Sequence, residues 1–203
     1  ELAAEFDTML AGGDLNSWGG GLAISITLIG QATDRPPLLR SGAKPGDRIL
    51  VTGSLGGSIL DHQFTFTPRV REALALNSRY ALNAVMDISD GLLLDLARLC
   101  EESGVGAELD MKAIPISNDA HRLSALRNDG VTPLRHALTD GEDFELLLAA
   151  SPDEAVKIVA EQPLGEVKVT DIGRITEKQG IWETDETGSP KPITPEGFQH
   201  RVG

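Results

Sequence analysis

Apolar residues along the chain follow two spacings, one typical of strands and one typical of helices. Alternating or continuous apolar positions rich in β-branched residues predict strands, over 20–31, 43–53, a short run ending at Ile88, 105–111, 143–151 and 169–176. A spacing of three or four predicts helices, over 2–10, 67–76, 91–102, 118–126, 132–138 and 152–161. Short strands at best are expected after Glu177. Because helices and strands interleave irregularly, the sequence predicts an α+β fold, a mixed β-sheet with packed helices.

Turn and cap residues divide this pattern into segments. Thr67 is expected to cap the helix at 67–76, with Pro68 in its first turn. Two prolines in 33–39 interrupt regular structure, so we place a domain boundary there and predict domains at 1–36 and 37–203. Residues 2–10 resemble the last turns of a helix, which suggests a piece of a longer polypeptide.

Composition narrows the classes of function. A net charge of -13 argues against a nucleic-acid partner, which would need basic stripes. No apolar run approaches the length of a membrane span, so no membrane partner is expected. The single Cys100 cannot form an internal disulfide, which fits a reducing cytoplasm. An anionic ligand would need a cation between it and so acidic a protein.

The stretch MDISDGLLLDL, residues 86–96, places acidic residues at a predicted strand-to-helix corner. The plainer interpretation is that Ser89 or Asp90 caps the helix. That interpretation leaves Asp87 unexplained, because a carboxylate ending a buried strand needs a partner. Carboxylates attract Mg²⁺ and a helix N-terminus attracts anions, so this corner could hold a metal ion and a phosphate together.

Three further motifs are weak when taken alone. GGDLNSW at 12–18 has the composition of a hairpin turn, and TDGEDFELLL at 139–148 that of a solvated turn before a strand. TGSLGGS at 52–58 is neither a Walker loop nor a GxGxxG motif, and we expect it to serve close packing of the backbone. The four histidines show no metal-ligand spacing.

Taken in order, the motifs GGD, RSGAKPGDRILVTGSLGGS, MDISDGLLLDL, SGVGAELD, DGEDFELLL and EGFQH resemble the thiamine-monophosphate kinase family. That family belongs to the superfamily of aminoimidazole ribonucleotide synthetase. The resemblance implies the fold of the superfamily's C-terminal domain. It also implies transfer of the γ-phosphoryl group of ATP onto thiamine monophosphate, assisted by several Mg²⁺ ions, in a homodimer when the protein is full-length.

The resemblance also implies roles for residues at matching positions. The implied metal ligands are Asp14, Asp87 and Asp90. The implied nucleotide contacts are Gly13, Asp14, Arg40 and Ser89. The implied substrate contacts are Glu142 and Phe198, the latter against the thiamine moiety. No side chain is assigned as a general base, because a phosphate monoester is already ionised near neutral pH and the task is to neutralise charge between two polyanions.

Several positions depart from the family pattern. Leu15 follows GGD where threonine is usual, and Asp140 stands where the GGED pattern has glycine. Most of the family's N-terminal domain is absent from this sequence, so we expect residues 1–36 to be its tail and this chain not to turn over by itself. The alternatives are a non-catalytic relative that binds nucleotide or thiamine phosphate, and a sister enzyme with another phosphorylated substrate.

Overall fold

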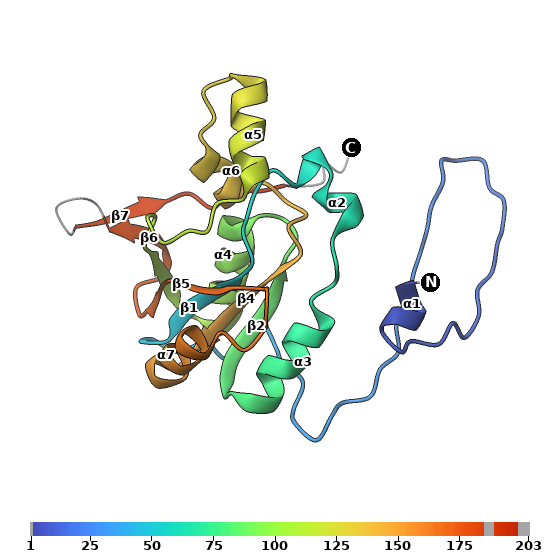
Figure 1. Ribbon diagram of the computed structural model, residues 1–203, viewed down its shortest axis with the longest axis horizontal. Helices are drawn as coiled ribbons and strands as arrows, with labels where there is room; N and C mark the ends of the chain where they lie inside the picture. Colours follow the sequence, from blue (N-terminus) through green and yellow to red (C-terminus); the bar gives the residue numbers. More distant parts are fainter. Residues whose placement is uncertain (1, 185–188, 199–203) are drawn as a thin grey trace. The chain divides into compact units, whose positions relative to one another are not determined.

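The computed structural model describes residues 2–184 and 189–198, and the chain divides into two compact units, Glu1–Pro36 and Pro37–Gly203 (Figure 1). The described part of the first unit contains one regular element, the short helix α1 (Leu2–Glu5), so the helix predicted over 2–10 ends early. The strand predicted over 20–31 is wrong, because this segment has no strand partner among the described residues. Its alternating apolar side chains are exposed, and alternation yields a strand only where a neighbour accepts its hydrogen bonds.

The second unit is built on one seven-stranded mixed sheet, in the order β2-β4-β1-β5-β3-β6-β7. The strands are β1 (Arg48–Thr52), β2 (Leu82–Ile88), β3 (Gly106–Leu109), β4 (Glu145–Ala150), β5 (Val169–Thr176), β6 (Gly180–Thr184) and β7 (Pro190–Ile193). Neighbouring strands are antiparallel except for β3 and β6, which run parallel. This confirms the predicted α+β class and the short strands expected after Glu177.

Helices and helical turns connect the strands. They are η1 (Ser58–Leu60), α2 (His62–Thr65), α3 (Val70–Arg79), α4 (Leu92–Ser103), α5 (Asn118–Arg127), α6 (Pro133–Thr139) and α7 (Pro152–Glu161). The helix predicted over 67–76 starts instead at Val70, with Arg69 rather than Thr67 at the N-cap. Arg69 has non-helical backbone angles, and its guanidinium is held by Glu145, which a local sequence pattern does not reveal.

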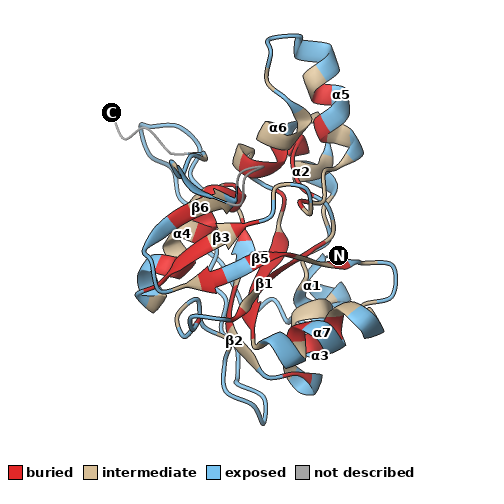
Figure 2. Cartoon of the chain, turned by 90° about the vertical axis from the view of Figure 1, so that its left-hand side faces the viewer, coloured by how far each residue is buried: buried red, intermediate tan, exposed pale blue. Residues whose placement is uncertain are grey.

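The central strands are buried on both faces, and alternate residues enter two different apolar clusters. In β1, Ile49 and Val51 join a cluster with the apolar stripe of α4, whereas Leu50 joins one with residues of α3 and α7. Figure 2 shows the buried residues concentrated on the strands between these helices. The sheet is therefore the middle layer of three, and its strand ends carry the polar residues considered next.

Cys100 is a buried core residue on α4, and burial raises its pKa to about 12, so it remains a thiol. Among the described residues, no helix is both long enough and apolar enough to cross a membrane.

Candidate functional site

The corner between β2 and α4 is shaped by a carboxylate that the sequence pattern did not single out. Asp95, in the first turn of α4, is fully buried, and its Oδ2 accepts hydrogen bonds from the backbone nitrogens of Ser89 (2.9 Å) and Asp90 (2.8 Å). The side chains of Ser89 and Asp90 therefore do not cap the helix as the plainer interpretation held. Gly91 is the N-cap, with φ 108°, and has no side chain to form a cap bond.

One arginine links the acidic residues of this corner. Arg98 Nη1 donates to Asp90 Oδ2 at 2.5 Å and to Asp95 Oδ1 at 2.7 Å. Burial raises the pKa of Asp95, while its bonds to the two backbone nitrogens and to Arg98 oppose that rise. These bonds give Asp90 a defined position in the turn.

Asp87 differs from both neighbouring aspartates. It lies near the end of β2, an edge strand, and its side chain is exposed rather than buried as expected. No described residue forms a hydrogen bond or an ion pair with its carboxylate. The premise that Asp87 needs an internal partner is therefore wrong, because water solvates it at the sheet edge. An unpaired carboxylate is nevertheless available to an external cation.

Two distant segments are hydrogen-bonded to this corner. The backbone nitrogen of Glu142 donates to Ser89 O at 2.7 Å, and that of Phe198 donates to Asp90 O at 2.8 Å. Glu142 has φ 66°, a left-handed conformation that non-glycine residues seldom adopt, and its side chain is exposed. The structure thus brings together four of the predicted site residues, Ser89, Asp90, Glu142 and Phe198.

A pocket of about 480 Å³ opens beside these contacts. We call it the Phe198 pocket; its lining residues are Ile59, Gln63, Leu123, Arg127, Thr139, Asp140, Gly141, Glu142, Gly197 and Phe198. A Cβ at position 141 would lie 2.8 Å from Ser89 O and one at position 197 would lie 2.2 Å from Asp90 O. Because residues 141 and 197 are glycines, the backbone that lines the Phe198 pocket can lie close to the β2–α4 corner.

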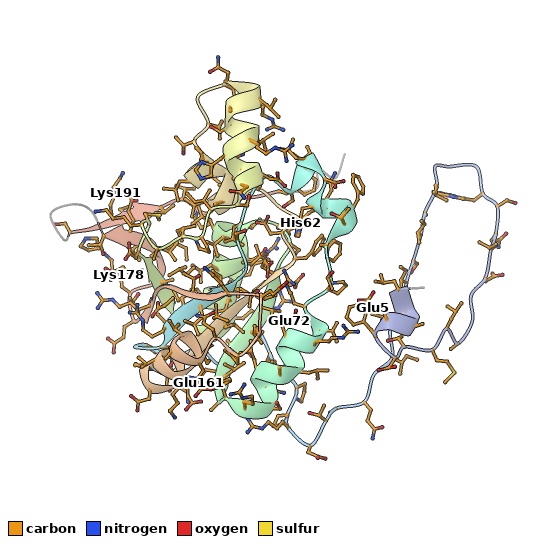
Figure 3. The ribbon with its side chains drawn as sticks, in the orientation of Figure 1. Glu5, His62, Glu72, Glu161, Lys178 and Lys191 are labelled. Atoms are coloured by element: carbon orange, nitrogen blue, oxygen red, sulfur yellow. The ribbon has the colours of Figure 1, made fainter. Side chains whose placement is uncertain are left out.

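The glycine-rich loop 52–58 forms hydrogen bonds with the acidic segment before β4. The backbone nitrogen of Gly56 donates to both carboxylate oxygens of Asp143, and Ser58 Oγ donates to Asp143 Oδ1 at 2.5 Å. His62 Nε2, from the α2 residue labelled in Figure 3, lies 3.0 Å from Asp143 O. Burial raises the pKa of Asp143 to about 7 despite the donors around it. Asp143 is therefore buried while Glu142 beside it is exposed, so the interpretation of 139–148 as a solvated turn holds only for part of the segment.

Glu145 is the second buried acid of this segment. Arg69 binds it with two hydrogen bonds, Nε to Oε2 at 2.9 Å and Nη2 to Oε1 at 2.6 Å, and Thr52 Oγ1 donates to Oε2 at 2.5 Å.

The glycine-rich loop 52–58 also packs closely against α6, since a Cβ on Gly56 would lie 2.5 Å from the backbone nitrogen of Ala137. The expectation that the loop serves close backbone packing is confirmed, and its second role is to hold carboxylates.

The remaining predicted residues lie elsewhere. Arg40 is exposed and directly follows Leu39, whose carbonyl accepts a hydrogen bond from Val85 of β2, so Arg40 borders the strand that carries Asp87. Gly13 and Asp14 belong to the first unit, where both are exposed and lie in irregular backbone. Their participation in a common site with Asp87 and Asp90 stays a prediction.

Among residues 2–184 and 189–198, no cluster of three or more histidine, cysteine or acidic side chains has the arrangement of a metal site. If Asp87 and Asp90 both bound Mg²⁺, they would supply two carboxylates, fewer than the six oxygen ligands that this ion takes. Phosphate oxygens, waters and further protein groups would have to complete the shell.

Sequence reasoning missed Asp95, Arg98 and Glu145. The signal for Asp95 was present, since it is an acid within the apolar stripe of a predicted helix. Arg98 lies three residues after Asp95 on the same helix, a spacing that also allows an ion pair, whereas Glu145 gave no local signal because Thr52 and Arg69 lie on distant elements.

Comparison with known proteins places this arrangement in a family. Residues 44–184 match the C-terminal domain of AIR synthase related protein. Thiamine-monophosphate kinase of Rhodopirellula baltica is 41% identical over 200 residues, which cover 98% of this chain and 61% of that protein. The enzyme of the same name from Caulobacter vibrioides is 31% identical over 196 residues, covering 89% and 56%. The chain therefore spans little more than half the length of these relatives.

Solved structures show the same fold. Thiamine-monophosphate kinase from Stenotrophomonas maltophilia K279a superposes with a TM-score of 0.58 at 31% identity, covering 72% of this chain and 52% of that one. AaThiL complexed with AMPPCP and TMP gives a TM-score of 0.60 at 29% identity, covering 80% and 54%. HypE of E. coli, a hydrogenase maturation protein, gives 0.64 at 19% identity, covering 80% and 54%, and shows the fold alone.

The domain match, the long alignments and the fold support one conclusion: the chain belongs to the AIR synthase related protein family, and within it resembles the thiamine-monophosphate kinases over nearly its whole length.

Proposed function

We propose that the protein transfers the γ-phosphoryl group of ATP to the phosphate of thiamine monophosphate, giving thiamine diphosphate. The names of its relatives and the AaThiL complex with AMPPCP and TMP support this reaction. The observation that carries it in this chain is the contact between the Phe198 pocket and the β2–α4 corner, made by the hydrogen bonds from Glu142 N and Phe198 N. A substrate whose ring enters the pocket could present its phosphate at the corner, where the aspartates lie.

The proposed reaction does not require a strong general base. A phosphate monoester is already ionised near neutral pH, so binding must align two polyanions and offset their repulsion. In this proposal Asp87, Asp90 and Asp14 hold Mg²⁺, while Arg40 and Ser89 contact the nucleotide together with Gly13. Bound Mg²⁺ would supply charge neutralisation between the phosphates. The exposed, unpaired carboxylate of Asp87 suits such a ligand.

Further parts of the proposal concern the longer protein. Residues 1–36 belong, in this proposal, to a domain that binds metal and nucleotide and that forms a homodimer. Residues 37–203 then form the C-terminal domain, which binds the thiamine moiety through Glu142 and Phe198. The reaction would take place in the cytoplasm, with no nucleic-acid or membrane partner.

One observation favours a second candidate, a non-catalytic relative that binds nucleotide or thiamine phosphate. Arg98 forms a 2.5 Å ion pair with Asp90, so a proposed metal ligand already has a cationic partner. If that pair persisted with nucleotide bound, Asp90 would be a weaker ligand for a metal ion. Binding without turnover would then result.

The test is an assay of the intact protein with ATP, Mg²⁺ and thiamine monophosphate. We expect thiamine diphosphate to form. Loss of a residue that only supports a metal ligand costs roughly 10- to 100-fold in metal affinity or activity. We expect Asp87→Asn, which replaces a proposed ligand itself, to weaken Mg²⁺-dependent nucleotide binding by at least that much. Because Asp87 is exposed and unpaired, its replacement should change the free energy of unfolding by less than about 0.5 kcal/mol.

Glu102→Gln is the matched control, since Glu102 is an exposed acid on α4 away from the corner. It should leave both binding and stability unchanged. Nucleotide binding without any product would favour the non-catalytic relative. A loss of stability in Asp87→Asn, with binding intact in the folded fraction, would show that Asp87 is structural.

A further inference from the structure

Asp140 is an acid at the Phe198 pocket to which neither the motifs nor the relatives assign a role. It follows α6 directly, and its Oδ2 accepts a hydrogen bond from the backbone nitrogen of Gly57 at 2.9 Å. His136 Nδ1 lies 3.1 Å from Oδ1 and 3.0 Å from Oδ2. The side chain keeps 24% of its exposure and lines the pocket. Helix α6 and the glycine-rich loop therefore hold the Asp140 carboxylate in place, while its side chain still lines the Phe198 pocket.

The hydrogen bond from His136 orients the carboxylate. A carboxylate only accepts hydrogen bonds, so the donor proton in this contact is assigned to His136 Nδ1. His136 is 2% exposed, and its Nε2 has no hydrogen-bond partner within the described ranges. The contact with His136 Nδ1 therefore holds the Asp140 carboxylate in one orientation. An ionised carboxylate can accept about four hydrogen bonds, so Asp140 keeps capacity for a ligand.

The other lining groups define what could occupy the pocket. Ile59 and Leu123 offer apolar surface, and Phe198 offers an aromatic side chain. Glu142 adds a second carboxylate, and Arg127 is the one cationic lining residue. Two acids and an aromatic face favour a flat cation, because a ring face attracts positive charge and the acids attract it further.

We infer that Asp140 is a second anionic contact for the substrate, selecting a positively charged heteroaromatic ring over a neutral ring of the same shape. The inference rests on the proposed function, in which the ring is the thiazolium of thiamine monophosphate. Asp140 acts beside Glu142 and accounts for charge selectivity rather than for phosphoryl transfer. His136 is its positioning residue, since it touches the carboxylate and does not line the pocket.

The experiment compares two ligands by calorimetry on the intact protein. One is thiamine monophosphate, and the other is its analogue in which a neutral thiophene replaces the thiazolium. The wild type should prefer the cation, and Asp140→Asn should reduce that preference about two- to fivefold, the range expected for one partly screened charge. Asparagine keeps an acceptor for Gly57 N, so the loop contact survives. Affinity for the neutral analogue should change little, which a merely structural role would not produce.

Glu102→Gln again removes a remote charge and should leave the ratio of the two affinities unchanged. If Asp140→Asn does not fold, Asp140→Ser takes its place, because its hydroxyl also accepts a hydrogen bond and carries no charge. An unchanged ratio in the folded variant overturns the role of Asp140 while the proposed function stands. Failure of the wild type to bind thiamine monophosphate at all overturns the proposed function, and the role of Asp140 with it.

Discussion

The surroundings of Asp143 keep its carboxyl group protonated up to an unusually high pH. It is 2% exposed, and desolvation is the largest cause of its raised pKa, about 7, with the nearby charges of Asp140 and Glu145 adding to it. Ser58 and the backbone of Gly56 donate to the ionised form and limit the rise. The same residue in an unfolded chain would ionise near 3.8.

This difference predicts how stability depends on pH. Between about pH 4 and pH 7 the folded protein keeps the proton of Asp143 while the unfolded chain releases it, so rising pH favours unfolding. The full difference in pKa corresponds to at most about 4 kcal/mol. Urea denaturation across this range should show the wild type losing stability as pH rises to about 7 and then levelling off.

Asp143→Asn provides the comparison for that measurement. Its amide oxygen can still accept from Gly56 N, and it has no proton to release, so its stability should depend less steeply on pH. Parallel curves for the two proteins would mean that the folded protein ionises Asp143 as readily as the unfolded chain does.

Single residues also show where sequence reasoning succeeds. The DISDG and GED motifs led to Ser89 and Glu142, which a backbone hydrogen bond joins, and to Asp90, whose carbonyl accepts from Phe198 N. The burial of Asp143 and Glu145 could not be predicted, because their partners at positions 52–58 and 69 lie more than seventy residues away. The local sequence pattern identifies acidic residues next to a strand, but their exposure to solvent depends on contacts made in the folded sheet.

At the scale of elements, five of the six strands predicted before Glu177 are present, as are the four helices predicted after residue 90, whereas the helix over 2–10 ends early and the one over 67–76 begins late. The helices α5, α6 and α7 begin where Ser117, Thr132 and Ser151 accept cap hydrogen bonds, and α4 ends at Gly104 in a left-handed conformation. Those signals are contained within a few residues. A strand depends on its neighbours, which is why the alternation at 20–31 did not become one.

The glycine-rich loop gives a prediction at this scale. Gly56 has φ +89°, and a Cβ there would press against the backbone of α6 at Ala137. Gly56→Ala should therefore destabilise the protein by roughly 3 kcal/mol or more, combining backbone strain with displacement of a helix. Thermal and urea unfolding would measure the loss.

Gly130→Ala is the control that separates strain from contact. Gly130 has a similar φ of +84°, but a Cβ there would meet nothing within 4 Å. It should lose only about 1–2 kcal/mol, the cost of the left-handed conformation for alanine. Equal losses in both variants would show that the loop yields to the added methyl group, and that close packing against α6 does not require Gly56.

At the scale of the whole molecule, the two units differ in how much they bury. Both apolar clusters are drawn from residues 43–181, on the two faces of one sheet. In the first unit, within residues 2–36, no side chain is buried. Burial of apolar area is the main source of folding free energy, so the second unit should hold nearly all of the stability.

Removing residues 1–36 should therefore leave a protein that unfolds cooperatively, with a free energy of unfolding within about 1 kcal/mol of that of the whole chain. Calorimetric unfolding of residues 37–203 alone would measure this. The same fragment should keep the Phe198 pocket and lose the contribution of Gly13 and Asp14 to nucleotide binding, because those residues lie in the removed unit. A fragment without a cooperative transition would show that the sheet needs the first unit to fold. A fragment that binds ATP and Mg²⁺ as tightly as the intact protein would instead exclude Asp14 from the site, leaving Asp87 and Asp90 as the sole acids proposed for metal in this chain.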